Sequence, residues 1–323
     1  MKKYMYKLLA LGVLILSLAV AAGCGLSDDK GASGQTITVD QKMGQTTVPL
    51  DPKRVVVLSY GALDSLDALG LGDRVVGVPS NYLPKYLEKY GDKNKYTNVG
   101  SVKDFDLEKI SALHPDLIII SDRQQAKYND LSAIAPTVYA GSSEVASGDD
   151  YYPAFVKESK MLGQIFQKEA EVDKALADLD AKIKGIQDQA AAEGKKGLVL
   201  MTTGGKVRAF GPGSRYAQVY NVAKLPSVID AKDEGSKIDD HGQVVSFEYL
   251  ATMNPDWILV LDRDSAIGKD GAAAKELLNT PLVNNTKAAQ NGKIIYLEPT
   301  LWYLSGGGIE SMNLELDELK QVF

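Results

Sequence analysis

The sequence predicts an α/β fold of two Rossmann-like lobes, each with a mostly parallel sheet, joined by a helical connector. Short apolar runs rich in Val and Ile recur along the chain without polar alternation, as in strands that helices cover on both faces. Helical stretches separate these runs, which favours parallel strands. A segment of eighteen residues also recurs at an offset of 140, which indicates two similar halves.

The N-terminus has the pattern of a secretory signal peptide, predicted over residues 1–23. Lysines at positions 2, 3 and 7 precede an apolar run from Leu8 to Ala22, and Gly23 leads to Cys24. The run is short for a membrane span, which needs about 20 residues, and a short N-terminal membrane helix is the alternative.

Cys24 is the only cysteine, so the chain can form neither an internal disulfide nor a multi-cysteine metal site. Its place after Ala21-Ala22-Gly23 resembles a bacterial lipobox, whose cysteine receives diacylglycerol, except that Ala21 stands where Leu is usual. We therefore expect lipid anchoring at Cys24, on the extracytoplasmic face of the cell membrane. Residues 24–35 are small, polar and rich in Gly and Ser, which is typical of a flexible tether.

Residues 36–150 are predicted to form the N-terminal lobe. Thr36–Leu50 alternates apolar and polar residues around Gly44, as in a β-hairpin. Helices are expected at Ala62–Leu69 and Leu107–Leu113. Continuous apolar runs in both halves of the chain are predicted as buried strands: Val55–Leu58, Val75–Val78, Leu117–Ile120, Leu198–Met201, Ile258–Leu261 and Ile294–Leu297.

The middle of the chain is predicted to be helical. No strand pattern occurs from Tyr151 to about Ala192. Phe155, Leu162 and Phe166 support one helix. A second helix has one apolar face, formed by Val172, Leu176, Leu179, Ile183 and Ile186. We assign residues 151–170 to a connecting helix and residues 171–323 to the C-terminal lobe.

The internal repeat aligns Asp106–Arg123 with Ser246–Arg263, with six identities in eighteen positions. Each copy is interpreted as a helix, an X-Pro-Asp turn, a buried strand and an Asp-Arg pair at the carboxyl end of that strand. Ligands of open α/β sheets bind at this edge, so Arg123 and Arg263 are expected to face one cleft between the lobes. The alternative is that each arginine only packs on its neighbouring Asp.

The repeat also predicts different positions for the two histidines. His114 aligns with Asn254 in the X-Pro-Asp turn, where a polar turn residue is expected. His241 aligns with Ser101, in a loop that leads from the ligand edge, and Lys103 shares the loop of Ser101. His241 and Lys103 are therefore candidates for the cleft, and a solvated loop position is the alternative for His241.

Two glycine-rich loops follow predicted strands. Arg215 and Tyr216 come after Gly211-Pro212-Gly213, in a tight loop next to a sheet edge. Trp302 and Tyr303 precede three glycines, and aromatic side chains at such an edge can wall a pocket. The Tyr303 phenolate could also bind Fe(III), which favours oxygen ligands. Packing between the lobes is the alternative for both aromatic residues.

The sequence lacks the motifs that mark several other classes of protein. The sequence has no Gly-x-Ser-x-Gly elbow, no HExxH and no phosphate-binding glycine motif, so an enzyme is not expected. A bare zinc or manganese site would need several histidines, and the chain has two. The net charge is −6 without a basic block, which argues against a nucleic-acid partner.

Taken together, the lipobox-like start, the two-lobed pattern and the Glu-x6-Pro-Asp repeat resemble the substrate-binding proteins of bacterial ABC importers for iron siderophores, haem and cobalamin. The resemblance covers essentially the whole chain and implies a class III periplasmic-binding-protein fold. Several segments resemble the branch of this family that binds ferric catecholate siderophores, petrobactin in particular. They are Ser121-Asp122-Arg123-Gln124, Phe210-Gly211-Pro212, Ser214-Arg215-Tyr216, His241-Gly242, Asp262-Arg263 and Trp302–Gly308.

The resemblance implies roles for individual residues. Three arginines would hold the anionic complex: Arg123, Arg215 and Arg263. Lys103 and Trp302 would lie near the ligand, and His241 and Tyr303 would complete the iron shell where the siderophore leaves positions open. Glu108 and Glu248 would dock onto arginines of the permease.

The function implied is that of a monomeric, lipid-anchored binding protein without an intrinsic cofactor. It would capture a ferric siderophore and deliver it to an ABC permease and its ATPase. Three alternatives stay open: a receptor for haem or a citrate-type siderophore, an enzyme that modifies a siderophore, and a surface adhesin.

Overall fold

The computed structural model describes residues 34–141, 148–229, 242–269 and 273–323. The predicted signal peptide, Cys24 and His241 lie outside these ranges. In the ranges described, no helix combines the length and the apolar character that crossing a bilayer requires.

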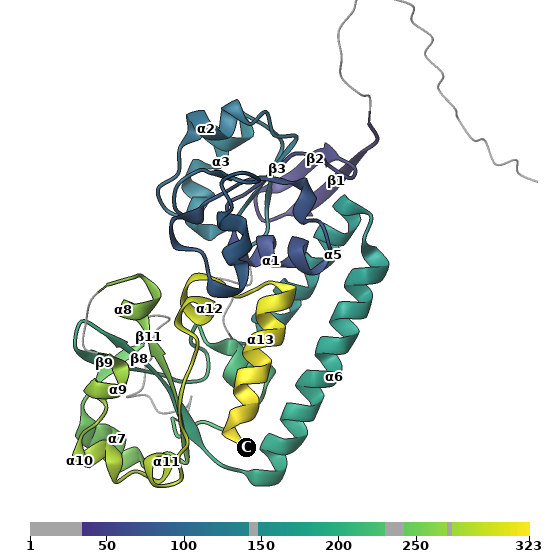
Figure 1. Cartoon of the computed structure of the whole chain (residues 1–323). Coiled ribbons are helices and arrows are strands. Elements are labelled where there is room, and N and C mark those ends of the chain that lie inside the picture. The colour runs from purple at the N-terminus through teal and green to yellow at the C-terminus, as the bar shows by residue number, and fades with distance from the viewer. Residues whose placement is uncertain (1–33, 142–147, 230–241, 270–272) are drawn as a thin grey trace, which may run out of the picture. The chain divides into compact units, whose positions relative to one another are not determined.

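A small hairpin and an all-parallel sheet come first in the chain (Figure 1). The hairpin pairs β1 (Thr36–Gln41) with β2 (Gly44–Pro49), as predicted, and Gly44 has a positive φ of 106°. The sheet has the order β5-β4-β3-β6-β7. Its strands are β3 (Val55–Val57), β4 (Val75–Val78), β5 (Thr97–Asn98), β6 (Leu117–Ile120) and β7 (Thr137–Tyr139), and its helices are α1 (Tyr60–Ala68), α2 (Leu107–Ala112) and α3 (Tyr128–Ser132).

The second sheet has the order β10-β9-β8-β11-β12 and is only partly parallel. β11 pairs in parallel with β8 and β12, whereas β9 pairs antiparallel with β8 and β10. The sequence reasoning missed β9 and β10, although Gly204-Gly205, both with positive φ, form the hairpin turn before β9. The strands are β8 (Gly197–Thr203), β9 (Lys206–Phe210), β10 (Gln243–Val245), β11 (Trp257–Asp262) and β12 (Ile294–Tyr296).

Short α-helices accompany the second sheet, and short 3-10 or π-helical segments occur throughout the described chain. The helices are α7 (Phe247–Met253), α8 (Arg263–Ala266), α9 (Ala274–Leu277), α10 (Pro281–Asn284), α11 (Lys287–Gln290), α12 (Pro299–Leu304) and α13 (Ile309–Leu319). The 3-10 helices are η1 (Gly72–Arg74), η2 (Ser80–Tyr82), η3 (Lys85–Gly91), η4 (Asp122–Lys127), η5 (Gly148–Asp150) and η7 (Lys320–Val322), and η6 (Gln218–Val222) is a short π-helix.

Two helices carry the chain from the first sheet to the second: α5 (Tyr151–Phe166) and α6 (Glu169–Glu193). The predicted boundary at residue 170 falls in the first turn of α6, because the left-handed Gln167, with φ 55°, separates the helices. The predicted apolar face of α6 is buried from Val172 to Ile186. Figure 1 shows α6 as the longest helix, with α13 alongside it.

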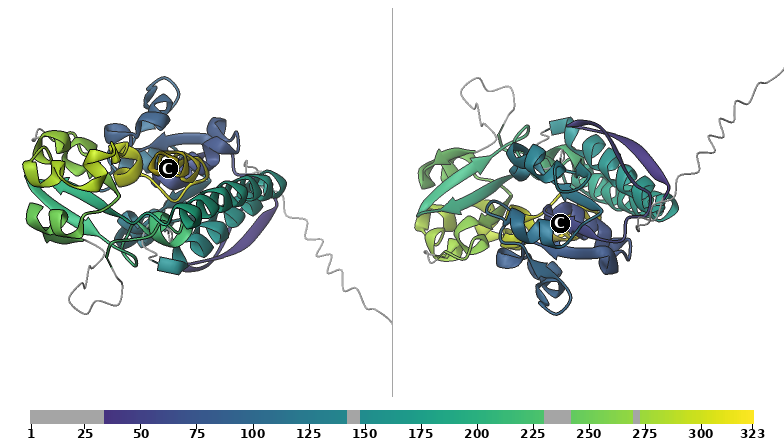
Figure 2. Two further views of the ribbon diagram at one scale, coloured as in Figure 1. Left: turned by 90° about the horizontal axis from the view of Figure 1, so that it is seen from below. Right: turned by 90° about the horizontal axis from the view of Figure 1, so that it is seen from above.

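The C-terminal helix α13 ties the two halves together. The Asp64 carboxylate on α1 accepts hydrogen bonds from the backbone of Glu310 and Ser311, at 3.1 and 3.2 Å. The backbone of Gly306 lies so close to Gly61 that a side chain at position 61 would collide with it. One hydrophobic core therefore includes residues of both sheets and of α5, α6 and α13. Figure 2, seen from below and from above, shows the yellow α13 next to the teal α6.

The repeat forms the same unit in both halves. Asp106 and Ser246 cap α2 and α7, and His114 and Asn254 both have positive φ, which confirms the predicted turn role of His114. After each turn comes the repeated Asp. The Asp116 carboxylate accepts from the backbone of Lys53 and Arg54, both at 2.9 Å, and that of Asp256 accepts from Lys196 at 3.0 Å. The repeated Pro-Asp thus fixes the start of the neighbouring strand in each sheet.

Candidate ligand-binding site

Arg123 lies in a rigid turn at the carboxyl end of β6. The Ser121 backbone N–H donates to Oε1 of Gln124 at 2.9 Å, and the buried Gln124 amide donates to the carbonyl oxygen of Val102. The turn that presents Arg123 is therefore joined to the loop that carries Lys103. This confirms the predicted position of the Asp-Arg pair at the end of its strand.

Arg263 lies at the equivalent end of β11, as the first residue of α8. Asp262 caps this helix by accepting from the Ser265 backbone N–H at 3.1 Å. The Nη1 atom of Arg263 donates to Oγ1 of Thr203 at 3.2 Å, at the end of the adjacent parallel strand β8. The side chain is also 3.9 Å from Asp264, so the neighbouring carboxylate neutralises it only in part.

Arg215 is presented by the glycine-rich loop after β9. Gly213 has a positive φ of 85°, which glycine adopts without strain. Tyr216 is buried and packs edge-on against Phe210, with ring centroids 4.8 Å apart. Because Tyr216 anchors the loop, the half-buried Arg215 side chain beside it is directed toward the interlobe space, with its guanidinium 5.7 Å from the Tyr216 ring centre.

Tyr303 brings the three arginines together. Its hydroxyl accepts from Nε of Arg263 at 2.6 Å, and its carbonyl oxygen accepts from a terminal N–H of Arg123 at 3.2 Å. The guanidinium groups of Arg263 and Arg215 lie 5.1 and 5.4 Å from its ring centre, within the range of cation–π attraction. In the part of the chain that the structure describes, no carboxylate comes within 4.0 Å of Arg123 or Arg215.

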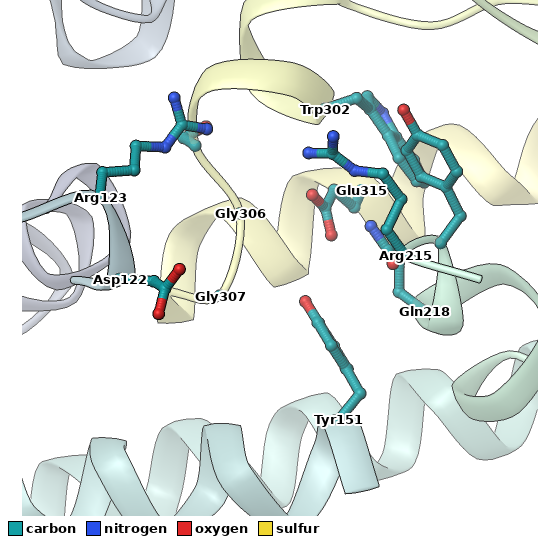
Figure 3. Close-up of a pocket in the computed structure, with 11 residues that line it drawn as sticks. Asp122, Arg123, Tyr151, Arg215, Gln218, Trp302, Gly306, Gly307 and Glu315 are labelled. Atoms are coloured by element: carbon teal, nitrogen blue, oxygen red, sulfur yellow. The ribbon is translucent and has the colours of Figure 1, made fainter. Parts of the chain in front are cut away.

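Two cavities meet at Arg123. The first, here called the outer cleft, has a volume of about 270 Å³ and is lined by both halves of the chain: Tyr60, Tyr82, Ser101, Val102, Lys103, Arg123, Arg263, Ile267, Tyr303 and Leu304. The second, here called the inner pocket, has a volume of about 150 Å³ (Figure 3). It is lined by Asp122, Arg123, Tyr151, Arg215, Tyr216, Gln218, Trp302, Ser305, Gly306, Gly307 and Glu315.

The remaining predicted residues occupy different surroundings. Lys103 is exposed and lines the outer cleft. Trp302 is buried, donates from Nε1 to Glu318 at 2.7 Å and lines the inner pocket, so it both packs the core and walls the site. Glu108 and Glu248 are exposed in the first turns of α2 and α7 and line neither cavity.

The sequence reasoning missed Tyr151, Gln218 and Glu315 in the inner pocket. A signal for Glu315 was present, because it lies three residues after Met312 on a helix whose buried face also holds Ile309, Leu316 and Leu319. An acidic residue in an apolar stripe is the informative exception to helical periodicity. Gln218 begins η6, three residues after Arg215, and carries no signal of its own.

Buried carboxyl groups behind the arginines are strongly perturbed. Burial raises the pKa of Glu315 well above its usual range, and the nearby Asp64 and Glu318 carboxylates raise it further. Burial also raises the pKa of Asp64 to about 7, although hydrogen bonds from Ser311, Tyr86 and Glu310 act in the opposite direction. Over the described residues, no group of three or more His, Cys, Asp or Glu could hold a metal ion.

Known proteins resemble the chain over most of its length. Petrobactin-binding protein YclQ of Bacillus subtilis (strain 168) is 40% identical over 98% of both chains. Ferric-anguibactin-binding protein FatB of Vibrio anguillarum is 30% identical over 96% of both chains. The crystal structure of YclQ superposes with a TM-score of 0.82 and 42% identity, covering 89% of this chain and 98% of that one.

The sequence profile of the periplasmic binding protein family matches residues 55–301, which span both sheets, the connecting helices and the loops of all three arginines. The predicted two-lobed α/β fold and the predicted family are therefore confirmed. This is a family of binding proteins rather than enzymes. The chain belongs to the periplasmic binding protein family.

Proposed function

We propose that this protein captures a ferric catecholate siderophore, of the petrobactin type, and delivers it to an ABC permease for iron uptake. The observation that carries the proposal is the convergence of Arg123, Arg215 and Arg263 on Tyr303 at a cleft lined by both halves of the chain. The likeness to YclQ over nearly the full length supports the petrobactin type.

The charges of the cleft suit such a ligand. Fe(III) held by three catecholates carries a charge of about −3, and the attraction between charges strengthens where water is excluded. Three guanidinium groups and the nearby Lys103 concentrate positive charge in a protein whose net charge is −6. Arginine remains charged at any physiological pH and can stack on catechol rings, so it suits this ligand better than lysine would.

Direct contact with the iron is a second part of the proposal. The Tyr303 hydroxyl lies in the arginine cluster, where its oxygen accepts a hydrogen bond from Nε of Arg263. Tyr303, and His241 from its loop, would occupy iron positions that the siderophore leaves open. Trp302 would contribute to the ligand site as part of the wall of the inner pocket.

Anchoring and delivery complete the proposal. Acyl chains on Cys24 would hold a monomeric protein at the cell membrane, on its extracytoplasmic face. Glu108 and Glu248 would then meet the permease. Their equivalent places in the repeat support this part of the proposal, because equivalent sites on two lobes suit a transporter of two-fold symmetry.

The test is a titration of the chain from residue 36 with ferric petrobactin and with a ferric hydroxamate, followed by tryptophan fluorescence. We expect tight, saturable quenching by the catecholate only, because Trp302 lies beside the site. Arg123→Ala and Arg263→Ala should each weaken binding by roughly ten- to a hundredfold, the size of one charge-assisted hydrogen bond.

Lys184→Ala is the matched control, because it removes a cation from the exposed surface of α6. It should bind like the wild type. An equal response to both iron complexes, or unchanged affinity in the arginine variants, would contradict the proposal. Haem, followed by its Soret band, and ferric citrate would then test the alternative ligands.

A further inference from the structure

The floor of the inner pocket carries hydrogen-bond acceptors that the described part of the chain does not satisfy. Glu315 is 1% exposed, and neither of its carboxyl oxygens makes a hydrogen bond of ordinary geometry there. The side-chain oxygen of Gln218, which is 5% exposed, is also without such a bond. Buried polar groups nearly always have a partner, so three acceptor atoms at one cavity indicate an occupant that donates hydrogen bonds.

The lining of the inner pocket contains both guanidinium and carboxyl groups. Arg123 belongs to both cavities, so the guanidinium side of the pocket continues into the outer cleft. Figure 3 shows the Glu315 carboxyl group between the side chains of Arg215 and Tyr151, and the Asp122 carboxyl group on the side of Arg123. A ligand whose anionic part lies against the arginines could therefore place a donor group among the acceptors.

Water is the simplest occupant of a polar cavity of about 150 Å³, which has room for several molecules. A ligand group displaces ordered water without loss when it reproduces the same hydrogen bonds. An alkylammonium group has up to three N–H donors and a positive charge. It could donate to Glu315 and Gln218 together, and unlike water it would also neutralise the charge of a Glu315 carboxylate.

We propose that the inner pocket is a subsite for an aliphatic ammonium group of the bound ligand, and that Glu315 selects for this group. The inference rests on the proposed function, because the ammonium would belong to the same ligand as the anionic iron complex. The ligand class is thus an iron chelate built on an amine-bearing chain. Glu315 is then a specificity residue on the inner side of the arginine cluster.

The protonation state of Glu315 predicts whether ligand binding releases or takes up a proton. Burial and the neighbouring carboxylates raise the pKa of Glu315, while Gln218 offsets part of the rise. An ammonium group favours the carboxylate, so binding should release a proton. The titratable and charged groups around Glu315 are Asp64 on α1, Tyr86 on η3, Asp122 and Arg123 at η4, Tyr151 on α5, Arg215 and Tyr216 before η6, and Glu318 on α13.

The experiment compares two ferric catecholate complexes with linkers of equal length, one containing a free aliphatic amine and the other an ether oxygen. Wild-type protein should bind the amine complex about tenfold more tightly, the effect of one charge-assisted hydrogen bond. Glu315→Gln keeps the shape of the side chain and should reduce this preference to less than twofold. Calorimetry in two buffers of different ionisation enthalpy should detect proton release by wild type only.

Glu310→Gln is the matched control, because it removes a carboxylate from the same helix at a position that lines neither cavity. It should keep the tenfold preference. An equal preference in wild type and Glu315→Gln, or proton uptake on binding, overturns the inference and leaves the proposed function intact. If neither complex binds, the proposed function fails. Crystals soaked in propylammonium then decide, since ammonium density beside Glu315 supports the subsite and water alone contradicts it.

Discussion

At the scale of single residues, buried acids mark the junction between the two halves of the chain. Asp64 is fully buried on α1 and caps the start of α13, which lies about 245 residues later in the sequence. The Tyr86 hydroxyl donates to the same carboxylate at 3.0 Å. Despite these bonds, burial raises the pKa of Asp64 to about 7, so the cost of removing the charge from water exceeds the gain from its partners.

Asp64→Asn should change how stability depends on pH. The folded pKa of about 7 lies above the unfolded value of 3.8, so between these values the folded state holds a proton that the unfolded state has lost. The Asp64 contribution is therefore full below about pH 4 and is lost as the pH rises toward 7. The wild type should lose a few kcal/mol of unfolding free energy relative to Asp64→Asn from pH 4 to pH 8, at roughly 1.4 kcal/mol per pKa unit.

Urea unfolding at several pH values measures this difference. Asp73→Asn is the control, because its side chain is 76% exposed and its stability should follow the wild type across the range. A constant difference between Asp64→Asn and the wild type at every pH would show that Asp64 acts only through its hydrogen bonds.

At the scale of elements, the repeated Pro-Asp turn orders the neighbouring strands. Asp116 and Asp256 each follow a left-handed turn residue and accept hydrogen bonds from the backbone at the start of β3 and β8. These bonds join the strand that carries an arginine to its parallel neighbour. The turn thus helps to fix the register between the two paired strands, and Arg123 and Arg263 follow the carboxyl ends of β6 and β11 in these pairs.

Asp116→Ala should destabilise the protein by about 2 kcal/mol and Asp256→Ala by about 1 kcal/mol, since Asp116 accepts two backbone hydrogen bonds and Asp256 accepts one. Chemical denaturation measures both values. Asp178→Ala removes an exposed ion pair on α6 and should cost less than 0.5 kcal/mol. Equal effects of all three substitutions would mean that the repeated Asp has no special role in the strand register.

At the scale of the whole molecule, the repeat places equivalent acidic side chains on two helices. Glu108 and Glu248 are exposed on α2 and α7, and each begins its helix near a cap that the repeat shares. Neither lines the outer cleft or the inner pocket. The proposed docking residues therefore lie apart from the proposed ligand site, so substitutions can test the two proposed roles independently.

If the proposed docking role holds, Glu108→Arg and Glu248→Arg should each lower iron delivery to the permease in proteoliposomes by about tenfold, because each reverses one of the proposed docking charges. Ligand affinity measured by fluorescence should stay within twofold of the wild type. Glu171→Arg, which reverses an exposed charge on α6, should leave both quantities unchanged. Normal delivery by the double variant would contradict the docking role.

Much of the site was predictable because it follows from local sequence. Strand ends of parallel sheets meet at one edge, so the repeated Asp-Arg pair predicted where Arg123 and Arg263 lie. The glycine-rich loops likewise predicted that Arg215 and Tyr303 lie near this edge. The acceptor groups of the inner pocket were not predictable in this way, because Gln218 and Glu315 lie on helical segments and reach the pocket only through packing.

The sequence by itself determined the N-terminal hairpin, six buried strands, the connector helices and the two-lobed plan, because continuous Val and Ile runs, helical periodicity and a repeat are local patterns; it did not determine β9 and β10. Only the tertiary structure decided how α13 returns to α1, and that return unites both sheets in one core. It also decided that Tyr303 gathers three arginines and that, among the described residues, the carboxyl oxygens of the buried Glu315 make no hydrogen bond of ordinary geometry. Contacts between residues far apart in the chain depend on the packing of whole elements, which no local pattern encodes.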